Sequence, residues 1–177
     1  MNELRTRRLI GTPAGPGDVA DIRRLHGDPR VMATLSADGA TFSEDQSRSF
    51  LERAAEHWKS HGFGLWTFHE QASSDFVGYG GIKTAVVEGR DEIELAYAIS
   101  FDHWRKGFAT EISRATLQHG FDTMHLDRII AFTLPHNKAS RGVMENCGFT
   151  YQRDILHANL PHVLYILNAR DFSQKNF

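Results

Sequence analysis

The chain has 177 residues, of which 41% are apolar, and its 20 basic and 22 acidic residues leave a formal net charge of −2. This balance argues against a dedicated nucleic-acid-binding protein, whose domains usually have an isoelectric point above about 9. The single cysteine excludes an intramolecular disulfide framework. No apolar stretch approaches the roughly 20 residues of a membrane-spanning helix. We therefore expect one soluble, cytoplasmic domain over residues 1–177, without a metal site, a nucleic-acid partner or a membrane contact.

The first elements predicted are a strand and two helices. Leu4–Ile10 predicts an opening strand at a partly exposed sheet edge. A helix follows from Asp18, a candidate N-cap, and ends at Gly27-Asp28-Pro29. A second helix begins at the capping-box pattern Ser43 to Gln46 and ends at a glycine. We expect the intervening segment Ala33–Phe42 to be a loop.

Strand-like runs then alternate with helical patterns to the end of the chain. Three strands separated by polar turns predict an antiparallel meander, and a strand–helix–strand unit and a closing hairpin follow. The expected strands are 63–70, 76–84, 92–100, 128–134, 149–156 and 163–169, and the expected helices are 107–123 and 137–146. The hairpin is expected to turn at Asn159-Leu160-Pro161. The fold class is therefore α+β, with about seven strands, mostly antiparallel, and about four helices.

The segment Arg105–Thr110 has the pattern of an anion cradle. A strand ends before it, the chain turns at Gly107, and the free N–H groups of a new helix point outward beside Arg105 and Lys106. No Walker lysine and no Gly-x-Gly-x-x-Gly pattern accompany it. The segment therefore predicts either a pyrophosphate site or an ordinary strand-to-helix turn.

Four motifs, in order, resemble the GCN5-related N-acetyltransferase (GNAT) superfamily, in particular its RimJ/RimL-like branch of ribosomal-protein N-acetyltransferases. They are Leu4-Arg-Thr-Arg-Arg-Leu9, Glu94-Leu-Ala-Tyr97, Trp104-Arg-Lys-Gly-Phe-Ala-Thr-Glu111, and Asn137-x-x-Ser140 with Gly148-Phe149. Arg105 departs from the pattern, because that branch often has glycine there. Met144 occupies the position where many members have a tyrosine, so a tyrosine general acid at that position is excluded.

The resemblance implies a three-layer fold whose two central parallel strands splay apart and hold acetyl-CoA. It places the pyrophosphate on Arg105, Lys106, Gly107, Phe108, Ala109 and Thr110, and the pantetheine arm along Tyr97, Ala98 and Ile99. It also implies that Asn137 hydrogen-bonds the cofactor near the splay and that Ser140 lies close to its sulfur. The implied activity is acetyl transfer to an amine, either the N-terminal α-amine of a ribosomal or other protein, or a small-molecule amine.

Acetyl transfer requires a neutral amine, a polarised carbonyl and a proton for the leaving thiolate. Glu94 is the candidate base, and Glu92 is the alternative, since two residues apart on a strand share a face. Ser140 is the candidate proton donor, although a serine in a first helical turn is often only a cap. Cys147 is expected to be a buried structural thiol, which favours direct transfer in a ternary complex.

Two further questions stay open at the level of sequence. A non-catalytic acyl-CoA-binding module would keep the cradle and Asn137 but would not need Glu94 or Ser140. The edge of the closing hairpin could pair two copies of the chain into a homodimer. None of the ten histidines receives a role.

Overall fold

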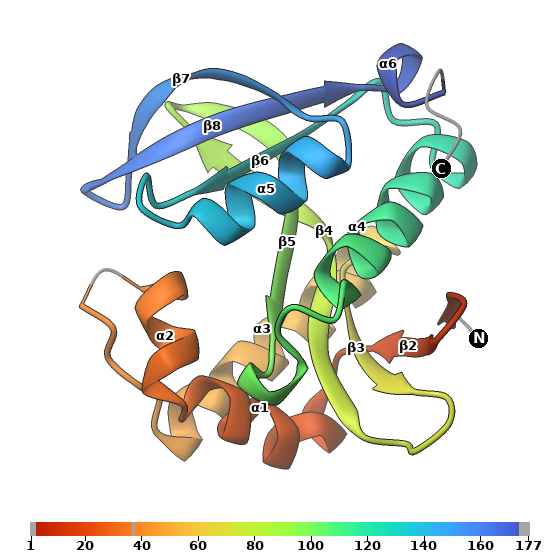
Figure 1. Ribbon diagram of the computed structural model, residues 1–177, viewed down its shortest axis with the longest axis vertical. Coiled ribbons are helices and arrows are strands. Elements are labelled where there is room, and N and C mark those ends of the chain that lie inside the picture. The colour runs from red at the N-terminus through yellow and green to blue at the C-terminus, as the bar shows by residue number, and fades with distance from the viewer. Residues whose placement is uncertain (1–2, 37, 174–177) are drawn as a thin grey trace.

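The computed structural model describes residues 3–36 and 38–173, and its middle layer is an eight-stranded sheet in the order β1-β2-β3-β4-β5-β6-β8-β7 (Figure 1). Neighbouring strands are antiparallel except β5 and β6, which are parallel. The strands are Leu4–Arg5 (β1), Leu9–Pro13 (β2), Leu65–Glu70 (β3), Phe76–Val87 (β4), Arg90–Ile99 (β5), Arg128–Thr133 (β6), Thr150–His157 (β7) and Leu160–Asn168 (β8). The mixed, mostly antiparallel α+β fold is thus confirmed.

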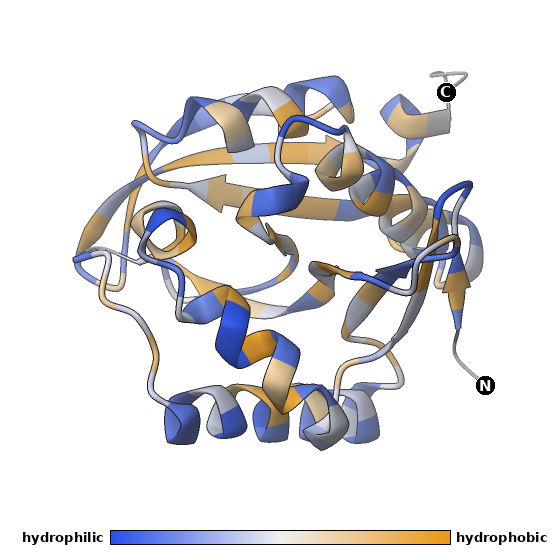
Figure 2. Cartoon of the chain, turned by 60° about the horizontal axis from the view of Figure 1, so that its bottom comes forward, coloured by the Kyte–Doolittle hydropathy of each residue, from blue (hydrophilic) through white to orange (hydrophobic). Residues whose placement is uncertain are grey.

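Helices cover both faces of this sheet. In Figure 1, α1 and α2 lie at the bottom, α5 lies with β6 to β8 at the top, and α4 runs between these two parts. The α-helices are Val19–His26 (α1), Pro29–Leu35 (α2), Glu44–His61 (α3), Phe108–Gln118 (α4), Lys138–Asn146 (α5) and Ala169–Ser173 (α6). Hydrophobic residues line the strands, and the helices carry hydrophilic residues on their outer faces (Figure 2).

The two central parallel strands diverge almost as soon as they meet. The ladder between β5 and β6 has a single residue pair, Glu94 with Ile130. On its other side, β5 pairs with β4 along its whole length, from Arg90 to Ile99. The expected splay is therefore present, and it begins directly after Glu94.

The opening strand differs from the prediction. Leu4–Ile10 is divided into β1 and β2, and the Thr6 hydroxyl accepts a hydrogen bond from Leu9 N at 2.9 Å in the bend between them. Because β1 forms the outer edge, β2 is paired on both sides, and Leu9 is fully buried instead of partly exposed.

Helix α2 was not predicted, and it covers the start of the expected loop Ala33–Phe42. Gly27 ends α1 as expected, but Pro29 then begins a new helix. The Asp28 side chain accepts a hydrogen bond from Arg30 N at 2.9 Å, and the missing N–H of Pro29 costs nothing at a first helical position. Pro29 therefore follows the end of α1 and is the first residue of α2.

Local turn chemistry explains the other boundaries. Ser43 and Gln46 form the predicted capping box, with N–H to side-chain oxygen distances of 2.7 and 3.2 Å. The closing hairpin turns at Ala158-Asn159, one residue before the predicted turn, because both residues adopt positive φ as a two-residue turn requires. Helix 107–123 is present, but its last turn, His119–Thr123, is a π-helix.

Glycines in β4 allow two strands to pack unusually closely. A Cβ atom at Gly81 would lie 2.2 Å from the carbonyl oxygen of Gly64 and 2.7 Å from Leu65 Cα. Both obstacles are backbone atoms, which cannot rotate away. The glycine at this position of the Gly78-Tyr-Gly-Gly81 run therefore permits the close backbone packing of β3 and β4.

We therefore expect Gly81→Ala to lower the free energy of unfolding by about 1–3 kcal/mol or more, as for other overpacked interiors. Gly142→Ala in α5 is the matched control, because a Cβ there meets nothing within 4 Å. Alanine should stabilise that helix by about 0.5–1 kcal/mol. Urea unfolding of both variants measures the difference, and equal effects would contradict the close-packing argument.

Candidate active site

A cavity of about 740 Å³ opens at the splay between β5 and β6. Its walls come from β4, β5, β6, β8 and α1 to α5, and from the loop before α4. Segments far apart in the sequence therefore converge here. Of the predicted site residues, it is lined by Glu94, Tyr97, Ala98, Ile99, Arg105, Gly107, Phe108, Ala109, Thr110, Asn137 and Ser140, and Lys106 is the one that does not line it.

The loop before α4 forms a cradle of unpaired backbone donors. Arg105 and Gly107 have φ values of 61° and 78°, and α4 has no side-chain cap. Among the described residues, the N–H groups of residues 105–110 have no acceptor. Alternating backbone conformations of this kind, followed by a helix N-terminus, form an anion-binding concavity. Arg105 adopts here the left-handed conformation that glycine adopts most readily.

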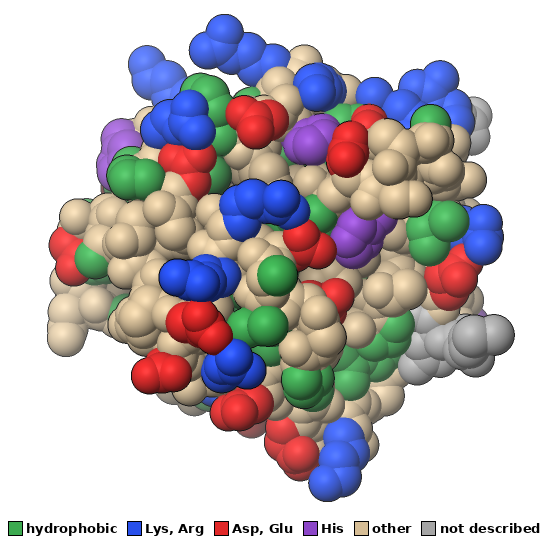
Figure 3. Space-filling model, turned by 90° about the horizontal axis from the view of Figure 1, so that it is seen from below, with side chains coloured by type: hydrophobic (Ala, Val, Ile, Leu, Met, Phe, Trp, Pro, Cys, Tyr) green, Lys and Arg blue, Asp and Glu red, His purple; other side chains and the backbone are tan. Residues whose placement is uncertain are grey.

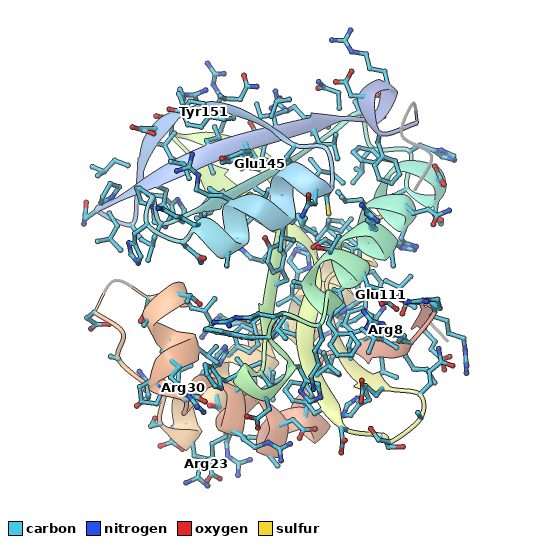
Figure 4. The ribbon with its side chains drawn as sticks, viewed as in Figure 1. Arg8, Arg23, Arg30, Glu111, Glu145 and Tyr151 are labelled. Atoms are coloured by element: carbon cyan, nitrogen blue, oxygen red, sulfur yellow. The ribbon has the colours of Figure 1, made fainter. Side chains whose placement is uncertain are left out.

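Helix α4 is fixed to the N-terminal strands by a carboxylate. Glu111 Oε1 accepts hydrogen bonds from the Thr6 hydroxyl at 2.6 Å and from Arg8 N at 2.9 Å, and Arg8 Nε donates to Glu111 Oε2 at 2.7 Å (Figure 4). Burial opposes ionisation of Glu111, but these hydrogen bonds outweigh it and hold its pKa below the usual value. The first predicted motif thus meets the third at the cradle, with the Arg8 guanidinium 4.1 Å from the centre of the Phe108 ring.

At the start of α5, the two polar residues Asn137 and Ser140 have different partners. Asn137 caps the helix by accepting from Ser140 N at 3.1 Å, and its amide nitrogen donates to the Thr34 carbonyl of α2 at 3.3 Å. The Tyr97 hydroxyl lies 2.9 Å from Ser140 Oγ and 3.1 Å from Ser140 O. Burial raises the pKa of Tyr97 above its usual value, so this phenol stays neutral. The helix cap is therefore Asn137, and the Ser140 hydroxyl faces Tyr97.

The two predicted catalytic residues approach the splay from opposite faces of the sheet. Glu94 and Tyr97 are three residues apart on β5, so their side chains point to opposite faces. Leu95 and Tyr97 pack with the core beneath α4 and α5, whereas Ala96 and Ala98 pack with α1 and α3. Glu94 is thus on the face of α1 to α3, and Ser140 is on the other face.

Glu94 is not paired with a second carboxylate, as the sequence allowed. It is buried and lies 2.5 Å from Lys83 Nζ, and Glu92 instead lies 2.5 Å from an Arg128 nitrogen. The expectation that repulsion between Glu92 and Glu94 makes one of them a better base is therefore wrong. The sequence analysis did not identify Lys83 as the partner of Glu94. The signal was the two-residue turn at Glu88-Gly89, which sets the strand register that places Lys83 opposite Glu94.

An aromatic cluster forms the cavity wall next to Glu94. His26 is 2% exposed, its Nε2 lies 3.2 Å from the Tyr79 hydroxyl, and its ring centre lies 4.7 Å from that of Phe42 and 5.0 Å from that of Phe50. Burial lowers the pKa of His26 to about 4, so the ring is neutral at pH 7. Sequence reasoning gave this histidine no role, because its partners come from α3, β4 and the segment after α2.

Three further expectations concern cysteine, metal and membrane. Cys147 is fully buried, as predicted. Within the described residues, no group of three or more His, Cys, Asp or Glu side chains could hold a metal ion. Likewise, none of the described helices combines the length and apolar character needed to cross a bilayer.

Comparison with known proteins adds independent information. A family model described as an acetyltransferase (GNAT) domain matches residues 8–150. The uncharacterized N-acetyltransferase YnaD of Bacillus subtilis is 37% identical over 145 residues, which are 82% of this chain and 81% of that protein. The FsC-acetyl coenzyme A-N(2)-transacetylase of Aspergillus fumigatus is 30% identical over 157 residues, covering 84% of this chain and 65% of that protein.

Solved structures share the fold at low sequence identity. An acetyltransferase from Agrobacterium tumefaciens has a TM-score of 0.82 at 21% identity, covering 95% of both chains. The ribosomal-protein alpha-N-acetyltransferase RimL, solved with coenzyme A, has a TM-score of 0.77 at 13% identity, covering 94% of this chain and 98% of that one. The aminoglycoside acetyltransferase AAC(6')-Ib, also solved with coenzyme A, has a TM-score of 0.77 at 14% identity with the same coverage.

The buried His26 should make stability depend on pH. Its pKa of about 4 is below the ordinary 6.5, so the unfolded chain binds the extra proton first as the pH falls. The free energy of unfolding should therefore decrease between about pH 6.5 and about pH 4, by up to about 1.4 kcal/mol per pH unit. In His26→Gln this contribution is absent, so urea unfolding near pH 7 and near pH 5 should show a smaller pH dependence than in wild type. Parallel pH profiles would contradict a buried neutral imidazole.

Proposed function

The chain belongs to the GNAT acetyltransferase family, and from this premise we propose that it transfers the acetyl group of acetyl-CoA to a primary amine, by direct attack in a ternary complex. We propose the N-terminal α-amine of a protein or peptide as the acceptor. The observation that carries the proposal is the convergence of the donor cradle, the splayed strands, Glu94 and Ser140 on one cavity. The fold shared with a ribosomal-protein alpha-N-acetyltransferase supports the choice of acceptor.

The residues present fit a coenzyme A thioester. The unpaired N–H groups of residues 105–110 match a pyrophosphate, and the exposed Arg105 and Lys106 add positive charge. Along the splay, the edge of β5 that faces β6 has no ladder partner after Glu94, so its backbone groups can hold an extended pantetheine arm. Asn137 retains one amide hydrogen beyond its bond to Thr34, which it can donate there.

The acetyl thioester supplies an activated acyl carbon and a thiolate leaving group, and the chain's own residues supply the proton transfers. Glu94, on the face of α1 to α3, accepts the proton of the acceptor ammonium. An N–H group of the Tyr97–Ile99 edge donates to the carbonyl oxygen as charge develops on it. When the carbon–sulfur bond breaks, Ser140, whose Oγ lies 2.9 Å from the Tyr97 hydroxyl, donates its proton to the leaving sulfur and takes up the second proton that the nitrogen loses as the amide forms. Tyr97 is here a positioning residue, because it acts through Ser140.

A small-molecule acceptor is the second candidate, favoured by two of the relatives. One solved neighbour is an aminoglycoside acetyltransferase, and one relative by sequence is an FsC transacetylase. The proposed roles of Glu94 and Ser140 suit either acceptor, since both present a primary amine. The alternative is that the chain binds acyl-CoA without catalysing transfer. Activity measurements distinguish this alternative from an acetyltransferase.

The catalytic roles predict a large and selective loss of rate. Glu94→Gln and Ser140→Ala should each lower kcat/KM by about 100-fold or more, as expected for the loss of a general base or acid. Binding of acetyl-CoA, followed by calorimetry, should change little. Glu92→Gln is the matched control on the same strand and should keep activity within about twofold.

Thiol release from acetyl-CoA with a panel of amines measures these rates. If both variants retain wild-type rates, the assigned base and acid are wrong. If wild type binds acetyl-CoA but releases thiol with none of the amines, the chain is a binding module and not an enzyme.

The cradle predicts a separate effect on cofactor binding. Gly107→Ala places a side chain at a φ of 78°, which should cost about 1–2 kcal/mol of stability and distort the loop. Gly89→Ala is the matched control, since its φ is 77° and a Cβ there meets nothing within 4 Å, whereas a Cβ at Gly107 meets only the end of the Arg8 side chain, at 3.6 Å. Gly89 lies in the turn between β4 and β5, outside the cradle. Both variants should lose similar stability in thermal melts, and only Gly107→Ala should bind acetyl-CoA more weakly. Equal affinities would contradict the cradle.

A further inference from the structure

The cavity wall on the Glu94 side is aromatic. It is lined by His26, Phe42, Phe50 and Tyr79. The ring centre of His26 lies 4.7 to 5.6 Å from those of the other three, and the ring centres of Phe50 and Tyr79 are 5.1 Å apart. These residues lie on the same face of the sheet as Glu94, because Tyr79 and Lys83 are four residues apart on β4 and Lys83 pairs with Glu94. An acceptor that presents its amine to Glu94 therefore places its nearest substituent against these rings.

The same wall has almost no free negative charge. Among the described residues that line the cavity, Glu94 is the single carboxylate, and Lys83 lies 2.5 Å from it. His26 is neutral at pH 7, and burial raises the pKa of Tyr79, so that phenol is neutral as well. A second or third ammonium group on the acceptor would lose its hydration here without gaining a partner, which is strongly unfavourable.

The outer surface around α1 to α3 does not supply the negative charge that the cavity wall lacks. Viewed from below, acidic and basic side chains are interspersed over this face (Figure 3). Several of the acids are already paired, for example Glu44 with Arg23, Asp21 with Arg24 and Asp28 with Arg30. Over its described residues, this face therefore offers no acidic rim that would attract a polycation.

The mouth of the cavity repeats the apolar character on both sides. Leu35, the last residue of α2, is 38% exposed and lines the cavity, and Phe132 of β6 lines it from the other part of the sheet. His162 of β8 packs edge-on against Phe132 with ring centres 5.4 Å apart. Apolar surface thus continues from the aromatic wall toward solvent.

Building on the proposed N-acetyltransferase activity, we propose that the acceptor has one α-amine beside a ring-sized apolar side chain, and that this side chain lies against His26, Phe42, Phe50 and Tyr79. Polyamines and aminoglycosides are then poor acceptors. Both a free amino-acid derivative and a peptide with a large apolar first residue have this chemistry, so the experiment includes both.

The first experiment compares acceptors of wild type at saturating acetyl-CoA by thiol release. Phenylalanine amide should exceed glycine amide in kcat/KM by about 10- to 100-fold, the range expected for burying one aromatic side chain. Spermidine and kanamycin should react no faster than glycine amide. A tetrapeptide beginning with phenylalanine shows whether the acceptor is a peptide or a small molecule. A rate above that of phenylalanine amide indicates a peptide acceptor, and a lower rate indicates a small molecule.

Two variants test the wall itself. Phe42→Ala should reduce the preference for phenylalanine amide over glycine amide by about tenfold. Leu35→Asp adds a carboxylate at the mouth and should raise the rate with spermidine relative to phenylalanine amide by about two- to fivefold. Leu156→Asp is the matched control, since Leu156 is 66% exposed on β7 and does not line the cavity. Because Leu35→Asp predicts a gain for one acceptor, a folding defect cannot produce the expected result.

The outcomes distinguish a failure of the proposed acceptor site from a failure of the proposed acetyltransferase activity. If glycine amide, spermidine and phenylalanine amide react equally well, or if spermidine is preferred, the aromatic acceptor site is wrong and the acetyltransferase activity stands. If none of these amines reacts although acetyl-CoA binds, the proposed function itself fails. An unchanged acceptor preference in both Phe42→Ala and Leu35→Asp would place the acceptor elsewhere.

Discussion

The single residue pair between β5 and β6 is the constraint on which the site depends. Glu94 faces Ile130 in the one ladder position that the two parallel strands share, and beyond it they separate. The separation costs few hydrogen bonds, because β5 is paired with β4 over ten positions and β6 with β8 over six. Each part of the sheet is thus stable on its own outer side, and the unpaired inner edges become the walls of a cavity.

Because side chains alternate along β5, the candidate catalytic residues lie on opposite faces of the sheet. Glu94 points toward α1 to α3, and Tyr97 points toward α5, where it holds Ser140. In the proposed mechanism, the base and the proton donor on opposite faces act on opposite ends of one reacting group in the gap between the strands. Asn137 links the two faces, since it caps α5 and also donates to the Thr34 carbonyl at the end of α2. Helix α2, which begins at Pro29, therefore forms part of the cavity wall on the face of α1 to α3.

Some of this arrangement could be predicted from local sequence, and some could not. The capping box of α3, the glycine that ends it and the cradle before α4 depend on neighbouring residues, and all three are present. Helix α2 was missed because Pro29 is both a helix terminator and a favourable first helical residue, and sequence alone does not distinguish the two. Glu92 and Glu94 were expected to influence each other, but Arg128 and Lys83, which come from other strands, neutralise them separately.

The sequence by itself determined the family, the order of the central elements and the position of the loop of unpaired backbone donors before α4, since motifs and turn residues act over a few positions of the chain. The tertiary structure decided which groups meet. It paired Lys83 with Glu94 and Tyr97 with Ser140, and it gathered His26, Phe42, Phe50 and Tyr79 into one wall. Such contacts depend on strand register and on helix packing between segments dozens of residues apart, and no local pattern encodes them. The residues that would select the acceptor are of this second kind, so they became visible only in the folded chain.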